Sequence, residues 1–512
     1  RKPKTKELRL NLCNPCNLWN LCMMRELLPE QAAAAYEINK HISVTAGPGS
    51  GKTTVLVERY LHILRQHKYN IDQIVAITFT NRAANEMRER LRQELGEILN
   101  TASPVERPRW LNYKRTLDGA VITTIHGFCA RLLREYPVEA RVDPQFLLLD
   151  EHRAAMLLES VVEEVLSEFI SNGHIEVSRL TLGVGRAKLA AALAQLYREA
   201  RGQGVSLEEL ASLTAANHAT ELDHARVLED IDKAMRAYLS IPRTSPKAKE
   251  NYALIIEAWP GVRSDLNQIP EHETLAEYCQ VIESFREQLR PAKRGNLVDH
   301  ITELDELVWG KELSGRLPQV CLDLFASRYA LEIINLLTVI DQRLHEEKQK
   351  LSALDFDDLE IRTIELLKND AVLVRATQRY RFFLVDEFQD TNGLQRELLE
   401  RLTLKQGRAA ANLFIVGDRK QSIYGFRGAD VDVFREMTNA LLEAGGEPRP
   451  LHANFRSQPP LLHFFNYLFK RLFQPSDDVP NFSDEELAKL GYVAHEPSEA
   501  KRELEDQGPL VE

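Results

Sequence analysis

The chain has 512 residues, 44% hydrophobic and 28% charged, with a formal net charge of −11, which predicts a globular protein of roughly three or four domains. The negative charge argues against a generally basic nucleic-acid binder, although a local basic groove stays open because salt screens charges more than about 8 Å apart. Six cysteines are too few for a disulfide scaffold and favour a reducing, cytoplasmic setting, and no apolar run approaches the roughly 18 residues of a membrane span, so no membrane partner is expected.

Residues 1–27 form a leading tail that begins at Arg1 and not at a methionine, which suggests a fragment or a processed chain. The basic start resembles a signal peptide, but asparagines interrupt the apolar run that a signal peptide needs. Cys13, Cys16 and Cys22 have the spacing C-x₂-C-x₅-C, and His41 is the nearest candidate for a fourth zinc ligand. A poorly ordered extension without metal is the favoured interpretation, and the zinc site is the alternative.

A phosphate-binding loop follows the first predicted strand, at residues 42–44. Gly49 and Gly51 let the backbone approach a triphosphate, Lys52 can reach the β- and γ-phosphates, and the Thr53 hydroxyl can bind Mg²⁺. A helix-like run comes next, which argues against the alternative of a plain glycine turn. The predicted nucleotide-binding residues here are Ala46, which stands where the usual pattern has glycine, with Gly47, Pro48, Gly49, Ser50, Gly51, Lys52, Thr53 and Thr54.

Two further strand-then-helix units follow the loop. The apolar runs Gln73–Thr80 and Gly119–Ile125 each lead into a helical pattern. Three such units in a row predict an α/β fold with a parallel, doubly wound sheet. Ligands of such sheets gather at the carboxyl ends of the strands, and the polar and aromatic residues that fall there are Phe79, Asn81, Thr124 and His126.

The pattern becomes helical between about residues 151 and 351. Apolar residues recur at helical spacing in three places: Leu158, Val162, Val165 and Phe169; Leu189, Leu193, Leu196 and Tyr197; and Ile333, Leu337, Ile340 and Leu344. We therefore expect a large all-helical inserted domain. Loops are predicted around its prolines, which are Pro242, Pro246, Pro260, Pro270 and Pro291.

The strand pattern then returns. Phe382–Val385 is a buried strand that ends in Asp386 and Glu387, Asn412–Val416 is another, and the segment 451–457 precedes a last helix. Asp386 would hold Mg²⁺ directly or through water, and Glu387 would orient and deprotonate the attacking water. A merely solvated acid pair is the alternative. Because Lys52 lies far away in the chain, the helical domain is expected to be inserted between two neighbouring strands.

Cationic and aromatic residues near the end of the chain add two possible roles. Arg427 and Arg456 are both candidates for a cation at the γ-phosphate, and spacing alone does not choose between them. Tyr424 and Phe426 could stack on unpaired bases. Two aromatic residues in a core are the alternative.

The segments TAGPGSGKTTVL, ITFTNRAANEMRERL, TIHGFCARLLREY, LVDEFQDTN, VGDRKQSIYGFRGAD and NFRS, in this order, resemble motifs of superfamily-1A DNA helicases of the UvrD/Rep kind. The stretch after TIHGF, with ALDFDDLE, is most similar to the AddA/RecB branch, the motor subunits of bacterial helicase–nucleases. The resemblance covers residues 28–473. It implies ATP and Mg²⁺ as cofactors, single-stranded and duplex DNA as partners, 3′-to-5′ movement, and a nuclease partner subunit of the AddB or RecC kind.

The resemblance also assigns residues. Gln31, which by itself reads as a surface glutamine, would read the adenine edge, and Phe455 would stack on the adenine. Gln421 would couple the γ-phosphate to the DNA-binding segment, and Arg456 would be the γ-phosphate arginine. The residues implied along the single-strand path are Phe79, Asn81, Thr124, His126, Tyr424 and Phe426, with Arg427 beside them; Phe426 stands where relatives often have tryptophan.

Five regions follow from this interpretation. They are a tail at 1–27, the first part of a RecA-like domain at 28–150, a helical insertion at 151–340, the second part of the RecA-like domain at 341–450, and the start of a second RecA-like domain at 451–512. The motifs that complete the second domain and a nuclease are not in the sequence. We therefore expect this chain alone to bind ATP weakly and to hydrolyse it slowly or not at all.

Two other functions stay open. The chain could be a non-catalytic DNA- and nucleotide-binding fragment or assembly subunit. It could also be a P-loop ATPase that acts on protein partners, although such a protein has no need for aromatic residues at the strand ends.

Overall fold

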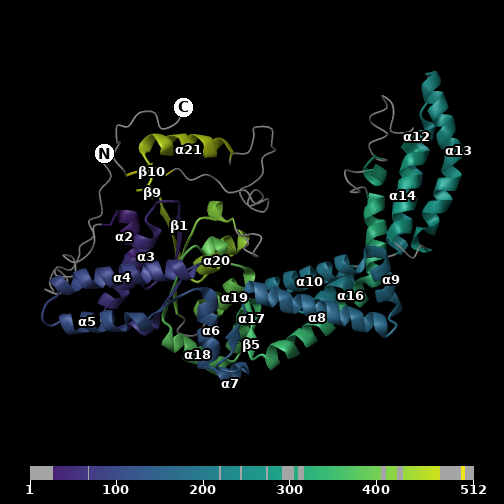
Figure 1. Cartoon of the computed structure of the whole chain (residues 1–512). Helices are drawn as coiled ribbons and strands as arrows, with labels where there is room; N and C mark the ends of the chain where they lie inside the picture. Colours follow the sequence, from purple (N-terminus) through teal and green to yellow (C-terminus); the bar gives the residue numbers. More distant parts are fainter. Residues whose placement is uncertain are drawn as a thin grey trace. The chain divides into compact units, whose positions relative to one another are not determined.

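The computed structural model describes residues 27–66, 68–217, 221–242, 245–271, 275–290, 305–309, 316–404, 411–423, 431–472 and 498–501. They belong to two compact units, one drawn from residues 1–146 and 356–512 and the other from 147–355 (Figure 1). None of the helices within these ranges is long and apolar enough to cross a membrane.

The first unit contains a sheet with helices on both faces. Its elements are α2 (Pro29–Tyr36), β1 (Ile42–Ala46), α3 (Lys52–Arg65), η1 (Ile71–Gln73), β2 (Ile74–Ile77), α4 (Asn81–Thr101), α5 (Arg107–Thr116), η2 (Leu117–Gly119), β3 (Val121–Thr123), α6 (Ile125–Glu135), α7 (Pro137–Ala140), α17 (Phe356–Leu367), α18 (Asp370–Arg379), β6 (Phe382–Val385), η6 (Phe388–Asp390), α19 (Gly393–Thr403), β7 (Asn412–Gly417), η7 (Arg419–Gln421), α20 (Val431–Glu443), β8 (Glu447–Leu451), β9 (Ala453–Asn454), α21 (Pro459–Leu472) and β10 (Glu499–Ala500).

The central sheet has six strands in the order β3-β2-β6-β7-β1-β8, and all neighbouring strands are parallel. This confirms the predicted α/β fold with a parallel sheet. One detail of the prediction is wrong: the strands that lead to Lys52 and Asp386 are not neighbours, because β7 lies between β1 and β6. β7 comes after the helical block in sequence, so the chain returns and inserts this strand beside β1.

Apolar residues on both faces of the sheet hold the helices. On one face Ile42, Val44 and Leu384 join a buried cluster with α2, α3, α4 and α5. On the other face the ring of Phe383 lies 5.5 Å from that of Phe128 in α6, and α20 packs against β1 and β8. Figure 1 shows the sheet between these helices. Strands buried on both faces explain the continuous apolar runs in the sequence.

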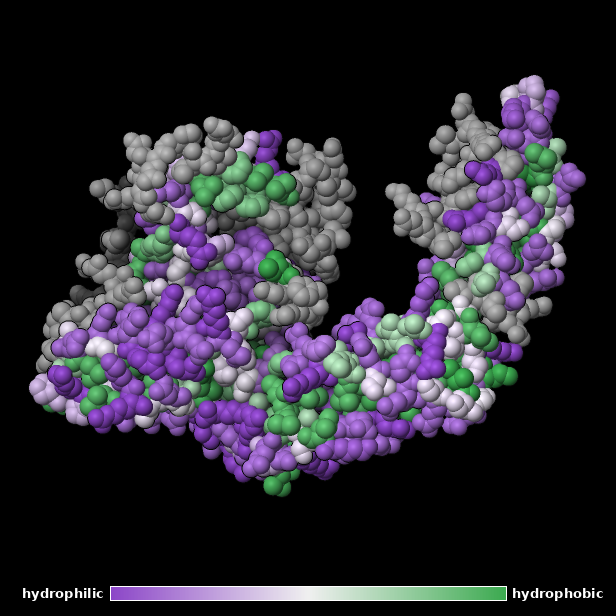
Figure 2. All heavy atoms as spheres, in the orientation of Figure 1, coloured by the Kyte–Doolittle hydropathy of each residue, from purple (hydrophilic) through white to green (hydrophobic). Residues whose placement is uncertain are grey.

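Helix α4 shows how an amphipathic pattern becomes a covering helix. Thr80 caps its first turn by accepting a hydrogen bond from the Ala83 N–H at 3.1 Å, and Ala84, Met87 and Leu91 are buried as predicted. Its outward residues are charged, and Figure 2 shows hydrophilic side chains over this part of the molecule. The helix therefore covers the sheet with one face and meets solvent with the other.

The second unit is built almost entirely from helices. Its elements are β4 (Leu147–Leu148), α8 (Glu151–Ser171), α9 (Ile175–Val184), α10 (Arg186–Gln203), α11 (Leu207–Asn217), α12 (Glu221–Ser240), α13 (Pro246–Gln268), η3 (Ile269–Glu271), α14 (Leu275–Leu289), η5 (Asp305–Trp309), α16 (Arg316–Lys350) and β5 (Ala353–Leu354). Because α16 runs to Lys350, this unit extends past residue 340.

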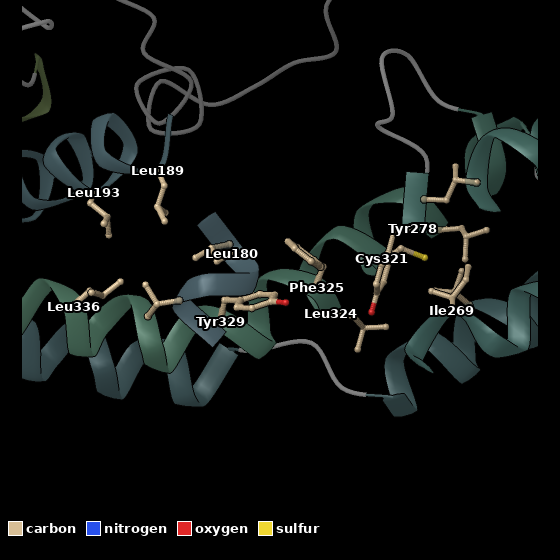
Figure 3. Packing of buried hydrophobic residues seen from close by; sticks show 14 of the residues in the cluster. Leu180, Leu189, Leu193, Ile269, Tyr278, Cys321, Leu324, Phe325, Tyr329 and Leu336 are labelled. Carbon is tan, nitrogen blue, oxygen red and sulfur yellow. The ribbon is translucent and has the colours of Figure 1, made fainter. Parts of the chain in front are cut away.

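Helix α16 contributes to one buried apolar cluster with most of the other helices of this unit. Figure 3 shows part of it, where the Phe325 ring lies 5.7 Å from that of Tyr278 and 4.9 Å from that of Tyr329. Leu196 was expected on the buried apolar face of its helix, but it is 43% exposed. Its neighbour Tyr197 fills the inward position instead.

Two prolines of this unit contradict the loop prediction. Pro246 is the first residue of α13, a position at which a backbone N–H makes no hydrogen bond within the helix, so proline is tolerated there. Pro260 lies inside the same helix. Pro270 lies in the short helix η3, Pro242 lies outside the helices, and Pro291 falls outside the described residues. Burial of Ile255, Val262 and Leu266 on one face keeps α13 helical through its proline.

Candidate nucleotide and DNA site

The predicted site segments begin where strands of the sheet end, except for Gln31, which lies in α2 before β1. The phosphate-binding loop follows β1, Thr124 follows β3, Asp386 follows β6, Asp418 follows β7, and His452 follows β8. Because all six strands are parallel, these segments share one edge of the sheet. The topology therefore brings together residues from both ends of the chain.

The loop after β1 has the backbone shape that phosphate binding requires. Gly49 and Gly51 have positive φ values of 74° and 88°, which other residues rarely adopt. Ser50 closes the turn by donating its hydroxyl to the Gly47 carbonyl at 2.8 Å. Helix α3 begins at Lys52, with Thr53 and Thr54 next in its first turn. The first N–H groups of a helix have no intrahelical acceptor, so this end of α3 suits an anion.

Lys52 and the acid pair meet at this edge. The Lys52 ammonium donates to the Glu387 carboxylate at 2.7 Å, and Gln389 donates its side-chain amide to the same oxygen at 2.8 Å. Glu387 has a left-handed backbone with φ 50°. Backbone strain of this kind in a residue other than glycine is typical of functional sites.

Asp386 and Asp390 retain protons more strongly than ordinary aspartates. Burial, followed by the nearby charge of Glu387, raises the pKa of each to about 6. A carboxylate in this situation gains from a cation, and Mg²⁺ usually binds one or two carboxylates together with phosphate oxygens. The donor set of Asp386 and Thr53 fits this requirement. The described part of the chain contains no cluster of three or more His, Cys, Asp or Glu residues that could hold a metal alone.

Gln389 joins the acid segment to the end of β7. Its amide oxygen accepts the Asp418 N–H at 3.0 Å, while its amide nitrogen reaches Glu387. Asp418 in turn accepts a hydrogen bond from the Gln421 side chain at 2.9 Å. A side chain on Gly417 would come within 2.6 Å of the Gln389 oxygen, so glycine is needed there. A continuous series of polar contacts thus connects Lys52 with Gln421.

The segment after β8 lies directly on the phosphate-binding loop. Asn454 donates its side-chain amide to the Pro48 carbonyl at 2.7 Å, and the Phe455 N–H donates to the Gly49 carbonyl at 2.9 Å. The side-chain oxygen of Asn454 also accepts the Arg456 N–H at 2.9 Å. A Cβ atom on Gly49 would lie 2.6 Å from the Arg456 Cβ. The first side-chain carbon of Arg456 therefore lies next to the phosphate-binding loop. Phe455 is 45% exposed.

Gln31 is buried, contrary to the interpretation of it as a surface glutamine. It is 4% exposed, donates to the Ser50 carbonyl at 3.0 Å, and accepts the Leu28 N–H at 3.2 Å. A Cβ on Gly51 would meet the Gln31 amide nitrogen at 2.8 Å and the Phe455 ring at 3.9 Å. Gln31 and Phe455 thus flank the same glycine of the loop.

The residues expected along DNA are in different situations. Phe79 is half-buried after β2, and Asn81 is the exposed first residue of α4. The Thr124 hydroxyl caps α6 by accepting the Gly127 N–H at 3.2 Å, so it has a structural role. The His126 ring contacts the Glu360 carboxylate at 2.9 Å. Tyr424, Phe426 and Arg427 lie outside the described residues.

His41, the nearest candidate for a fourth zinc ligand, has a structural role in the sheet. Nδ1 of His41 accepts the Leu413 N–H at 3.1 Å, which ties β1 to β7. Burial lowers the pKa of His41, which favours the neutral ring that this acceptor role requires. Cys13, Cys16 and Cys22 lie outside the described residues.

Three functional candidates were not predicted from the sequence: Gln389, Asn454 and Glu360. Each acts through a contact with a segment that is distant in the chain, and none has a distinctive spacing. Only their position within the motif segments DEFQDTN, NFRS and ALDFDDLE offered a signal.

Comparison with known proteins identifies the family. A family model described as the UvrD/REP helicase N-terminal domain matches residues 27–441. Among relatives that are the A subunits of ATP-dependent helicase/nucleases, the chain is 30% identical to that of Alkaliphilus metalliredigens, 29% to that of Anoxybacillus flavithermus and 28% to that of Bacillus thuringiensis. The alignments cover 92%, 90% and 93% of this chain but 40%, 42% and 42% of these relatives, so the chain spans about two fifths of their length. With its parallel sheet and phosphate-binding loop, the chain belongs to the UvrD/REP helicase N-terminal-domain family.

Proposed function

We propose that this chain is the ATP-binding portion of a DNA helicase that couples ATP hydrolysis to movement along single-stranded DNA in repair and recombination. The contact of 2.7 Å between Lys52 and Glu387 carries the proposal, because it brings the phosphate-binding lysine to the acid pair. Family membership supports the same function.

The proposed ATP site uses the loop from Ala46 to Thr54. Backbone N–H groups at the start of α3 face the phosphates, and Lys52 contacts the β- and γ-phosphates. Thr53 and Asp386 would hold Mg²⁺, which would neutralise charge on the phosphates. Gln31 and Phe455 flank Gly51 and are proposed to hold the adenine. Gln31 would have to share its amide between Ser50 and the base.

Glu387 is proposed as the general base that positions water for attack. In the structure its carboxylate is engaged by Lys52 and Gln389. Lys52 must therefore leave Glu387 to reach a phosphate, and this exchange frees the carboxylate to accept a proton from water. The ion pair keeps both groups in place until then.

Two further residues are proposed to respond to the γ-phosphate. Arg456 lies beside Gly49 and would stabilise the charge that develops there. Gln421, which is connected to Glu387 through Asp418 and Gln389, would pass the change to the adjoining segment with Tyr424, Phe426 and Arg427. Phe79, Asn81 and His126 are proposed to contact the single strand at the same sheet edge.

The direction of movement and the partner are proposals from the family. We propose 3′-to-5′ movement and assembly with a nuclease partner subunit of the AddB or RecC kind. The relatives, which are named as one of the subunits of a helicase/nuclease, support such an assembly. Measuring strand displacement on duplexes with a single-stranded tail at either end tests the direction.

The decisive experiment compares ATP turnover by the full-length natural protein with and without single-stranded DNA. DNA is expected to raise turnover, and Lys52→Ala should lower it at least about 100-fold, the equivalent of roughly 2.7 kcal/mol. Nucleotide-free DNA binding should stay within about twofold, because Lys52 contacts ATP and not DNA.

The matched control is Lys40→Ala, an exposed lysine just before β1, at the opposite end of the strand from Lys52. It should leave turnover unchanged. Turnover that persists in Lys52→Ala, or that does not respond to DNA in the unaltered protein, contradicts the proposed function.

A further inference from the structure

Glu360 is a buried carboxylate that joins three helices. It lies in α17, is 2% exposed, accepts hydrogen bonds from two side chains and contacts a third. One oxygen accepts from Gln395 of α19 at 2.7 Å and contacts Nε2 of His126 in α6 at 2.9 Å. The other oxygen accepts from Asn392 at 3.1 Å.

The contacts on one side of Glu360 lead to the acid pair. Asn392 follows the short helix η6, which begins directly after Glu387. The side-chain oxygen of Asn392 caps α19 by accepting the Gln395 N–H at 2.8 Å. The side-chain amide nitrogen of Asn392 donates to Glu360. A shift of the segment that follows Glu387 would therefore be passed to Glu360 through Asn392, whose side-chain oxygen and nitrogen both make hydrogen bonds.

The contact on the other side leads to the proposed DNA path. His126 is in the first turn of α6, immediately after β3. Its Nε2 atom lies 2.9 Å from a carboxylate oxygen of Glu360. The Phe356 ring, 4.7 Å away between centroids, packs against the imidazole. Glu360 and Phe356, both from α17, thus restrict the orientation of the His126 ring.

A buried charge is unfavourable unless its hydrogen bonds are satisfied. Packing between α6, α17 and α19 could be achieved by an apolar side chain, as it is by Leu359, which is fully buried beside Glu360. A carboxylate at this position instead gives directional contacts to both the acid segment and the residue proposed to meet DNA.

We propose that Glu360 is a positioning residue that couples the ATP site to His126, so that nucleotide state and DNA contact influence each other. The proposal rests on the function proposed above. A coupling of this kind is reciprocal and commonly changes affinity or stimulation by about 5- to 150-fold. Glu360 touches neither ATP nor DNA in this proposal and acts only through Asn392, Gln395 and His126.

The test measures DNA-free and DNA-stimulated ATP turnover of the full-length natural protein carrying Glu360→Gln. Glutamine keeps the size of the side chain but has one acceptor oxygen, whereas two carboxylate oxygens of Glu360 meet Asn392, Gln395 and His126. DNA-free turnover should stay within about twofold and stimulation by DNA should fall about tenfold. The matched control is Glu365→Gln, an exposed carboxylate on the same helix, which should leave stimulation unchanged.

A second variant covers the case in which Glu360→Gln does not fold. Asn392→Ser retains a side-chain oxygen that can cap α19 but removes the amide group that donates to Glu360. It should lower stimulation with little change in melting temperature. In addition, Glu360→Gln combined with His126→Ala should be no worse than His126→Ala alone, because both changes interrupt the same connection.

Three results overturn the proposal. They are unchanged stimulation in Glu360→Gln and Asn392→Ser, additive losses in the double variant, and an equal fall of DNA-free and stimulated turnover with a lower melting temperature, which indicates a structural role only. A lack of stimulation in the unaltered protein is a different failure, since it contradicts the proposed function itself.

Discussion

Glu387 combines a strained backbone with two strong side-chain contacts. A left-handed conformation costs a residue with a Cβ roughly 1–2 kcal/mol, yet this glutamate has φ 50°. Its carboxylate is held by Lys52 and Gln389. Retention of a strained acid where glycine would fit the backbone favours a chemical role for its carboxylate.

Glu387→Gln should separate binding from chemistry. Glutamine keeps the size and can still accept from Lys52, but it cannot take a proton from water. We expect ATP turnover to fall at least about 100-fold while affinity for an ATP analogue stays within about threefold. The control is Glu397→Gln, a half-buried glutamate on α19 that is paired with Arg401. Retained turnover in Glu387→Gln would show that another group is the base.

Asn454 is expected to hold Arg456 in place. Its side chain bonds the Pro48 carbonyl and accepts the N–H groups of Arg456 and Ser457. Asn454→Ala should lower the free energy of unfolding by about 1–3 kcal/mol, because buried polar groups lose their partners, and should lower ATP turnover.

Asn454→Asp provides a comparison, since it keeps the acceptor for Arg456 but replaces the donor to Pro48 with a carboxylate oxygen. Melting temperature and turnover should lie between those of the alanine variant and the unaltered protein. Turnover unaffected by Asn454→Ala would mean that this contact does not position Arg456.

Sequence reasoning found the residues whose chemistry is tied to a local pattern. Gly49, Gly51 and Lys52 stand in a recognisable loop, and the acid pair follows an apolar strand. Gln389, Asn454 and Glu360 have no such pattern, because their partners belong to other elements. Taken by itself, Gln31 was wrongly interpreted as a surface residue for the same reason: the loop that buries it folds over α2 from later in the chain, and its role at the adenine stays a prediction.

At the scale of elements, the strand β8 was not predicted because Pro448 and Pro450 interrupt its pattern. Both prolines are tolerated because β8 is at the edge of the sheet. The Glu447 N–H donates to the His41 carbonyl at 2.9 Å, so N–H groups at this position and alternate ones face β1. The prolines lie between them, where an N–H would face the open edge.

Helix α13 offers a test of local stability. Pro260 lies in its interior and cannot donate to the residue four positions earlier, and Gly261 follows. Gly261→Ala should raise the free energy of unfolding by about 0.5–1 kcal/mol, because a Cβ there meets no atom within 4 Å. Pro260→Ala should stabilise further, since it restores a hydrogen bond.

The contrasting control is Gly185→Ala. Gly185 has φ 91°, so alanine there should be strained and should lower the melting temperature. A lower melting temperature for Gly261→Ala or Pro260→Ala would mean that the bend or the close packing at this point of α13 is needed.

At the scale of the whole molecule, the sequence predicted a helical block between two strand-rich parts because its hydrophobic period changes from that of strands to that of helices. The prediction that β1 and β6 are neighbours failed because strand order depends on pairing between distant segments. Sequence periodicity carries no information about such pairing.

Residues 147–355 should fold as an independent unit. They enclose their own buried cluster, and the chain enters and leaves at adjacent points, where Leu147 of β4 pairs with Ala353 of β5. Compact units with adjacent ends often fold alone. A protein made of these residues should be helical by circular dichroism and unfold cooperatively. A gradual transition without a melting point would contradict this expectation.

The central claim is that Lys52 and Asp386 serve one Mg²⁺–ATP complex, and binding of an ATP analogue with and without Mg²⁺ tests it most directly. Asp386→Asn should remove most of the Mg²⁺ dependence, whereas Asp370→Asn, at the start of α18, should not. The double variant Lys52→Ala, Asp386→Asn should lose less binding free energy than the sum of the losses in the two single variants, and the difference should be about 0.5–3 kcal/mol. Strictly additive losses, with the Mg²⁺ dependence intact in Asp386→Asn, would contradict a shared site.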